Sequence, residues 1–234
     1  MSTTLTRRRD FLARLGTSIA ALAGATRPLA ASDLVGGPTG PAAFDDTWTR
    51  RVRSAKHRVV FDAPEVNDGL ALLQPWILRA GYRDAMGHTG ADVATVVVLR
   101  HQAAVLGVDD ASWAKYGLGA VRKVDDPATG QPATRNPWSR GAPGAAPDAR
   151  MSALLGGPVD PTVAGVLALG GVVLVCDLAL RNTAGMIARE RQLDAAVVHA
   201  ELRAGVVPGV ILQPSGVYAT ARAQEVGCTF MRST

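Results

Sequence analysis

Four short segments of this chain place polar or reactive side chains directly after a predicted strand. They are Asp62-Ala63, Arg100-His101, Cys176-Asp177 and Pro214-Ser215-Gly216. In parallel α/β sheets, ligands bind beyond the carboxyl ends of the strands, where the N-termini of helices present free N–H groups. We therefore expect a site at this edge, with Asp62, Asp177, Ser215 and Gly216 as candidate ligand-binding residues around a thiol.

Cys176 is the candidate nucleophile of this site. A thiol at a strand-to-helix junction can be held as a thiolate by the helix dipole, which suits a nucleophile or a sulfur carrier. The carboxylate of Asp177, next in the chain, would act in the opposite direction. The alternative is that Cys176 is one more small buried residue at the end of the strand at residues 172–175. Sequence alone leaves both interpretations open.

The second cysteine, Cys228, opens the last predicted strand. If that strand is parallel to the others, Cys228 lies at the amino edge of the sheet and Cys176 at the carboxyl edge. Two thiols so far apart do not form a disulfide, even in an oxidising compartment. We expect Cys228 to belong to the core.

Histidine and serine offer possible partners for the thiol. His101 follows the second strand and could act as an acid, a base or a hydrogen-bonding partner, or it could satisfy a backbone carbonyl instead. Ser215 lies in Pro-Ser-Gly rather than in a nucleophile elbow, so a helix cap is the alternative there. The other histidines lack metal-ligand spacing and no phosphate, dinucleotide or haem motif occurs, so neither metal nor cofactor is predicted.

Strands and helices alternate along the chain. Apolar β-rich runs predict strands at residues 57–62, 93–99, 172–175, 209–213 and 228–232. Helices are predicted at residues 67–82, 110–116, 162–169, 178–189, 194–204 and 217–226. This alternation predicts a single α/β domain whose mostly parallel sheet, of about five strands, is covered by helices on both faces.

Two segments rich in proline and glycine interrupt this pattern. Residues 32–56 read as a linker, so the domain is expected to span residues 57–234. Residues 123–161 read as an insertion or flap outside the core, and a loop of this length is usually functional or disordered. Trp138 and Met151 are the residues expected to dock it.

The first 31 residues have the parts of a twin-arginine export signal. The leader contains Thr6-Arg7-Arg8-Arg9-Asp10-Phe11-Leu12, a mildly apolar run at residues 15–25, and small residues up to Ala31, after which we place cleavage. The run is shorter than the roughly 20 residues of a membrane span, so no stable membrane insertion is expected. We expect a periplasmic or other extracytoplasmic location; the alternative is a disordered basic tail on a cytoplasmic protein.

Most of the net positive charge of the chain lies in this leader. The whole chain has 25 basic and 20 acidic residues, a formal charge of +5. Residues 1–31 hold five of the basic and one of the acidic residues, which leaves 20 against 19 and a net charge of +1. Without a basic surface, nucleic acid is not an expected partner.

Three segments together resemble the DsrE/YchN-like family of sulfur-relay proteins. They are VVLVCDLALR at residues 172–181, VPGVILQPSGV at residues 207–217 followed by RAQE at 222–225, and VVVLRH at residues 96–101. The similarity covers about residues 57–122 and 162–232 and leaves the insertion outside.

The resemblance implies a three-layer α/β/α domain that assembles into trimers or hexamers. It also implies that a cysteine at the position of Cys176 carries a persulfide, with a sulfur donor or acceptor protein as partner. The leading hypothesis is therefore an exported sulfane-sulfur carrier that uses Cys176, with His101 nearby. The alternatives are a non-catalytic ligand-binding or oligomeric scaffold module, and an enzyme loaded with a cofactor before export.

Overall fold

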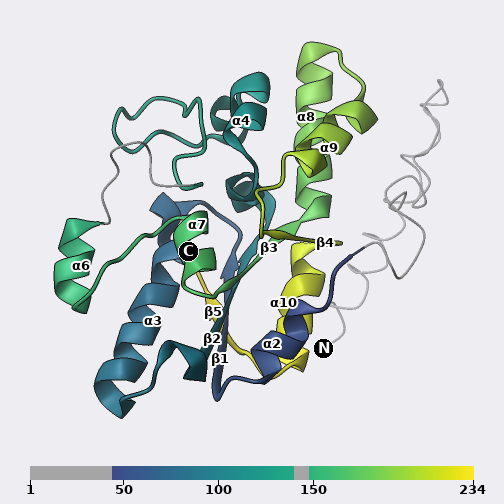
Figure 1. Ribbon diagram of the computed structural model, residues 1–234. Coiled ribbons are helices and arrows are strands. Elements are labelled where there is room, and N and C mark those ends of the chain that lie inside the picture. The colour runs from purple at the N-terminus through teal and green to yellow at the C-terminus, as the bar shows by residue number, and fades with distance from the viewer. Residues whose placement is uncertain (1–43, 140–147) are drawn as a thin grey trace, which may run out of the picture. The chain divides into compact units, whose positions relative to one another are not determined.

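A five-stranded, all-parallel sheet forms the centre of the fold (Figure 1). The structure is a computed structural model that describes residues 44–139 and 148–234. The predicted leader and the first part of the predicted linker lie outside the described residues. The strands are β1 His57–Ala63, β2 Val93–Leu99, β3 Val172–Cys176, β4 Ile211–Gln213 and β5 Thr229–Arg232, in the order β4-β3-β2-β1-β5.

The register aligns the strand ends that the sequence singles out. Ala63 of β1 pairs with Leu99 of β2, and Leu99 pairs with Val175 of β3. Cys176 then pairs with Gln213 at the end of β4. The residues that follow β1, β2, β3 and β4 therefore meet at one edge of the sheet, as expected for parallel strands.

Helices cover both faces of the sheet, which confirms the predicted three-layer α/β/α domain. One face carries α3 Leu70–Met86, α4 Asp110–Tyr116, α5 Leu118–Arg122, α7 Val163–Ala168, α8 Asp177–Arg191 and α9 Ala195–Ala204, and the other carries α2 Trp48–Arg53 and α10 Gly216–Glu225. Short 3₁₀ turns lie at Asn67–Gly69, Gly90–Asp92 and His101–Gly107, and α6 Ala149–Leu155 lies in the insertion. No helix among the described residues is long and apolar enough to cross a membrane.

The strand order explains why the two faces are covered so unequally. Strands β1 to β4 follow one another across the sheet in one direction, so right-handed crossovers place all their connecting helices on the same face. The chain then returns to pair β5 with the free side of β1. This reversal places α10 on the opposite face. There Ala219 and Ala223 pack against Val98 and Leu174 of the sheet.

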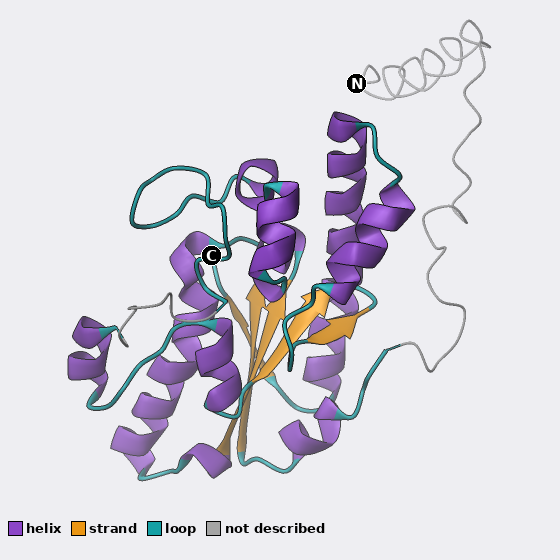
Figure 2. Cartoon of the chain, turned by 45° about the horizontal axis from the view of Figure 1, so that its top comes forward, coloured by secondary structure: helices purple, strands orange, loops and turns teal. Residues whose placement is uncertain are grey.

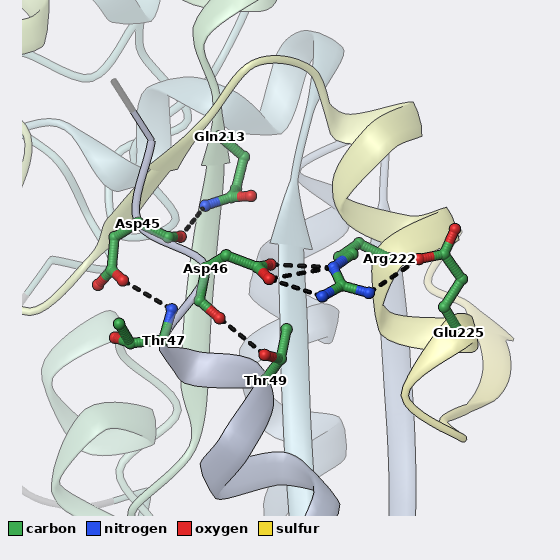
Figure 3. A network of polar contacts seen from close by, with 7 residues as sticks. All are labelled: Asp45, Asp46, Thr47, Thr49, Gln213, Arg222 and Glu225. Atoms are coloured by element: carbon green, nitrogen blue, oxygen red, sulfur yellow. Dashed lines mark hydrogen bonds and ion pairs between the residues drawn. The ribbon is translucent and has the colours of Figure 1, made fainter. Parts of the chain in front are cut away.

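The segment before β1 is not the linker that the sequence predicts. Helix α2 buries Trp48 and Val52 in the core of the second face. Figure 3 shows how the residues ahead of it are fixed: the guanidinium of Arg222 donates to both carboxylate oxygens of Asp46, and the side-chain amide of Gln213 donates to the carbonyl of Asp45 at 2.8 Å. From residue 44 onward, the expectation of a linker is therefore wrong.

The described part of the insertion also contributes to the core, contrary to the prediction of a flap. Trp138 is 8% exposed and packs over Gly69, where a side-chain carbon would lie 2.2 Å from the indole nitrogen. Gly69 also has φ +74°, a conformation that favours glycine. The side-chain amide of Asn136 donates to the carbonyls of Leu106 and Val108. Trp138 docks the insertion as predicted, whereas Met151 is only half-buried.

Candidate functional site

A pocket of about 390 Å³ opens at the carboxyl edge of the sheet. Figure 2 shows the arrowheads of the central strands ending together at this edge. Three of the four predicted strand-end segments line the pocket: Arg100 and His101 after β2, Cys176 at the end of β3, and Ser215 and Gly216 after β4. The remaining lining residues are Arg122, Leu178, Ala179, Asn182 and Val217.

Cys176 is both the last residue of β3 and the N-cap of α8. The run of valines before it forms a fully buried strand, and the helix begins at the next residue. Its sulfur accepts the backbone N–H of Ala179 at 3.3 Å, and the residue is 5% exposed. A thiolate at this position would receive a hydrogen bond and the positive end of the α8 dipole.

The other cysteine is remote, as predicted. Both cysteines are free and buried, and Cys228 precedes β5 at the amino edge of the sheet. Burial raises the pKa of Cys228 to about 11, although the charge of Arg58 acts in the opposite direction. The two thiols therefore differ in position and surroundings, and they do not form a disulfide.

Asp62 does not line the pocket but holds Arg100, which does. The guanidinium of Arg100 donates to Asp62 through Nε at 2.6 Å and through Nη2 at 2.8 Å. This bidentate hydrogen bonding to Asp62 raises the pKa of Arg100, to which the nearby Cys176 sulfur also contributes. Gly216 packs on the stem of Arg100, because a side-chain carbon there would lie 2.3 Å from Arg100 Cβ. Asp62 and Gly216 thus fix where Arg100 lies.

Arg122 is a site residue that sequence reasoning missed. It ends α5, is 9% exposed, and lines the pocket. Its Nη1 contacts the sulfur of Met186 at 3.4 Å, and its Nε has no hydrogen-bond partner. Burial lowers the pKa of Arg122. No local motif marks it, since it is the last residue of a five-residue helix that directly precedes the proline-rich segment.

His101 lines the mouth of the pocket without contacting the thiol. Its side chain is exposed and makes no hydrogen bond to Cys176 or to any other residue in the described ranges. Its backbone has φ +51°, which is uncommon outside glycine and is more frequent near functional sites. The predicted pairing of His101 with Cys176 is absent from this arrangement, although the two residues share the pocket.

The structure does not bring Asp177 to the pocket that Cys176, Ser215 and Gly216 line. The residue is 1% exposed, and its carboxylate contacts His199 at 2.8 Å, Arg181 at 3.5 Å and Arg203 at 3.6 Å. Since His199 and Arg203 belong to α9, Asp177 ties α8 to α9. Its negative charge is compensated there rather than beside the Cys176 sulfur.

Ser215 caps α10, which is the alternative that its Pro-Ser-Gly context favours. Its hydroxyl oxygen accepts the N–H of Tyr218 at 3.0 Å. The N–H of Leu178, in the first turn of α8, donates to the carbonyl of Pro214 at 3.3 Å. This contact brings the N-termini of α8 and α10 together in one pocket wall.

A larger pocket of about 490 Å³ lies elsewhere and is lined by residues such as Trp76, Arg79 and His88. It contains no thiol, and none of the predicted site residues lines it.

Within residues 44–139 and 148–234, no three side chains of His, Cys, Asp or Glu are grouped so as to hold a metal ion. The chain matches no protein-family model and no curated protein sequence.

Proposed function

We propose that this protein is an exported, DsrE-like carrier of sulfane sulfur, and that Cys176 bears the sulfur as a persulfide. The observation that carries the proposal is the place of Cys176 in the pocket. Its sulfur is the N-cap of a 15-residue helix and lies within the electrostatic influence of Arg100. The pocket therefore places a hydrogen-bond donor and a guanidinium close to the sulfur, an arrangement that suits a reacting cysteine.

The transfer is a displacement at sulfur. The Cys176 thiolate attacks the terminal sulfur of a donor persulfide, R–S–SH, so that a new S–S bond forms at Cys176. The donor's own S–S bond breaks, and the electron pair leaves with R–S⁻. The terminal sulfur keeps its proton, and Cys176 becomes Cys–S–SH without any oxidant or reductant.

The rest of the pocket suits such a step. No carboxylate lines it, and Arg100 and Arg122 contribute positive charge that favours anionic reactants and leaving groups. Leu178 and Val217 are 51% and 73% exposed at its rim and offer an apolar surface to a docking donor. His101, exposed at the mouth, is a candidate polar contact for the donor rather than for the thiol.

Intact-mass measurement tests the proposal. Purified protein is incubated with glutathione persulfide, separated from it, and weighed. We expect one added sulfur on the wild type and on Cys228→Ser, and none on Cys176→Ser. If the mass of the wild type does not change, or if Cys176→Ser gains the same sulfur adduct, the proposal is contradicted.

A second candidate function is a non-catalytic binding module, which the burial of Cys176 favours. The residue is 5% exposed although it lines the pocket, so its sulfur is largely shielded from solvent. In that case Cys176→Ser would leave ligand binding and oligomeric state intact, and iodoacetamide would fail to label Cys176 in the folded protein.

Export and assembly belong to the same proposal. We infer from the leader that the chain crosses a membrane by the twin-arginine route and acts in the periplasm or another extracytoplasmic space. We infer from the family resemblance that it forms trimers or hexamers. Light scattering on the purified protein tests assembly, and a monomer at micromolar concentration would contradict it.

A further inference from the structure

Arg122 is a buried charge without an acidic partner. Buried arginines are normally paired with carboxylates, because an unpaired buried charge is costly. No ion pair in the described part of the chain includes Arg122; its Nε lacks any acceptor, and its Nη1 reaches only the Met186 sulfur. A guanidinium nevertheless stays protonated in proteins. The positive charge of Arg122 is therefore uncompensated where it meets the pocket.

The surrounding wall adds no negative charge. Neither Asp nor Glu lines the pocket. The carboxylate of Asp62 is engaged by Arg100, and that of Asp177 contacts His199, Arg181 and Arg203 instead. Helix α10, ten residues long, begins in the wall at Gly216. Because the amides of a first helical turn lack intrahelical acceptors, this end of α10 favours an anion. The hydroxyl of Ser215 accepts from Tyr218 and still has a proton to donate.

We propose that this pocket binds a small tetrahedral oxyanion, with Arg122 as its main counter-charge and with Ser215 and the first turn of α10 as further donors. Donors on separate elements suit an anion with several oxygens better than a planar carboxylate. The proposal deepens the proposed function, on which it rests for the role of the pocket, by naming a ligand class for it. It does not require Cys176 to react.

Calorimetric titration of the purified protein with sodium sulfate, sodium phosphate and sodium acetate tests the proposal. We expect sulfate and phosphate to bind the wild type and Cys176→Ala equally well, and acetate to bind more weakly. Arg122→Met should weaken sulfate binding by at least about tenfold, which is the scale of one charge-assisted hydrogen bond. Failure of sulfate to bind the wild type, stronger binding of acetate, or equal binding of sulfate by Arg122→Met would overturn it.

Arg79→Gln is the matched control. Arg79 is also a partly buried arginine whose pKa burial lowers and whose Nε has no partner, but it lines the other pocket. Its loss removes the same charge from the protein and should leave sulfate affinity unchanged. An equal loss of affinity in both variants would show that overall charge, and not this pocket, is responsible.

Melting temperature separates binding from folding. Methionine in place of an uncompensated buried arginine should leave the melting temperature unchanged or raise it, so that lost binding cannot be ascribed to unfolding. If Arg122→Met does not fold, Arg122→Lys replaces it in the test. Lysine keeps the positive charge but not the planar guanidinium, so we expect it to bind sulfate more weakly than the wild type but still measurably. If a folded Arg122→Lys binds no sulfate, the role assigned to the charge is overturned.

The two proposals can fail separately. If the protein binds sulfate but Cys176 does not take up sulfur, only the proposed function is contradicted. If Cys176 takes up sulfur but the protein does not bind sulfate, only the present inference is contradicted.

Discussion

Cys176 and Cys228 are equally hidden from solvent but differ in what surrounds the sulfur. Cys176 receives a backbone N–H at the start of α8 and lies near Arg100. Cys228 packs among apolar residues of α10 and the sheet, and burial raises its pKa to about 11 from an ordinary value of 9.0. Cys228 therefore remains a neutral thiol over the whole range in which most proteins are stable.

The raised pKa of Cys228 predicts how stability changes in alkali. Between about pH 9 and pH 11 the unfolded chain releases the Cys228 proton while the folded chain keeps it. The unfolded state then binds fewer protons, so the free energy of unfolding falls as the pH rises through this window. Urea unfolding at pH 8 and pH 10 measures the fall. Cys228→Ala should show a smaller fall, because other groups alone remain to titrate, and an identical fall in both proteins would contradict the assignment.

The strand ends could be predicted from the sequence, but the partners of each polar side chain could not. Cys176, His101 and Ser215 line one pocket because parallel strands bring their carboxyl ends together. Asp62 lies near the end of β1 and Asp177 begins α8, as the predicted strand ends imply, yet arginines and a histidine from other elements engage their carboxylates. Such partners come from tertiary packing. Arg122 could not be predicted as a pocket residue for the same reason. It belongs to α5, which does not directly follow any of the strands, and only tertiary packing brings it to the pocket.

Among the helices and strands, the strands could be predicted best from the sequence. The β-branched run of β2 has the predicted bounds because a strand buried on both faces is apolar throughout. Strand β4 starts two residues later than predicted, since Gly209 has φ +90° and Val210 closes a turn onto Val207. Helix α2 was missed because six residues beside a glycine- and proline-rich stretch give too short a pattern. Only its packing against the sheet stabilises a helix this short.

Asn136 connects the insertion to an element that carries a site residue. Its side-chain amide donates to the carbonyls of Leu106 and Val108 at 2.8 and 2.9 Å, and its oxygen accepts the N–H of Trp138. Leu106 belongs to the 3₁₀ segment that starts at His101 on the pocket mouth. All of these groups are buried, so no solvent would replace a lost hydrogen bond.

Asn136→Ala should therefore loosen both the insertion and the 3₁₀ segment. Two buried carbonyls lose their donor, which predicts a fall of about 2 to 3 kcal/mol in the free energy of unfolding. Urea unfolding measures this fall, and hydrogen exchange should show faster exchange in residues 101–108. Gln224→Ala, at an exposed position on α10, is the control and should change the free energy by less than about 0.5 kcal/mol. A similarly small change for Asn136→Ala would mean that the insertion is not part of the folded core.

For the molecule as a whole, the proposal of twin-arginine export concerns a domain with a low net charge and with strand pairs far apart in sequence. Removal of residues 1–31 leaves a net charge of +1. The sheet pairs strands far apart in sequence, such as β1 with β5, so the domain forms only once nearly the whole chain is available. Formation of long-range parallel pairs is slow and exposes aggregation-prone edges. Under the proposed twin-arginine route, these strand pairs would form in the cytoplasm before export, so the slow folding step would not take place outside it.

Lysine substitution of the paired arginines tests that route. Lysine keeps the positive charge of the leader but not the guanidinium groups that define the signal. In the double variant Arg8→Lys, Arg9→Lys, we expect uncleaved precursor to accumulate in the cytoplasm and the mature form to disappear from the periplasmic fraction. Immunoblots of fractionated cells measure both. The control is Arg14→Lys, which lies in the leader but after the paired-arginine motif and should be exported normally. Because the domain itself is unchanged, the retained precursor should be soluble and should resist protease as the mature protein does. Undiminished export of the double variant would assign the leader to a route that carries unfolded chains, in which case the fold would have to form outside the cytoplasm.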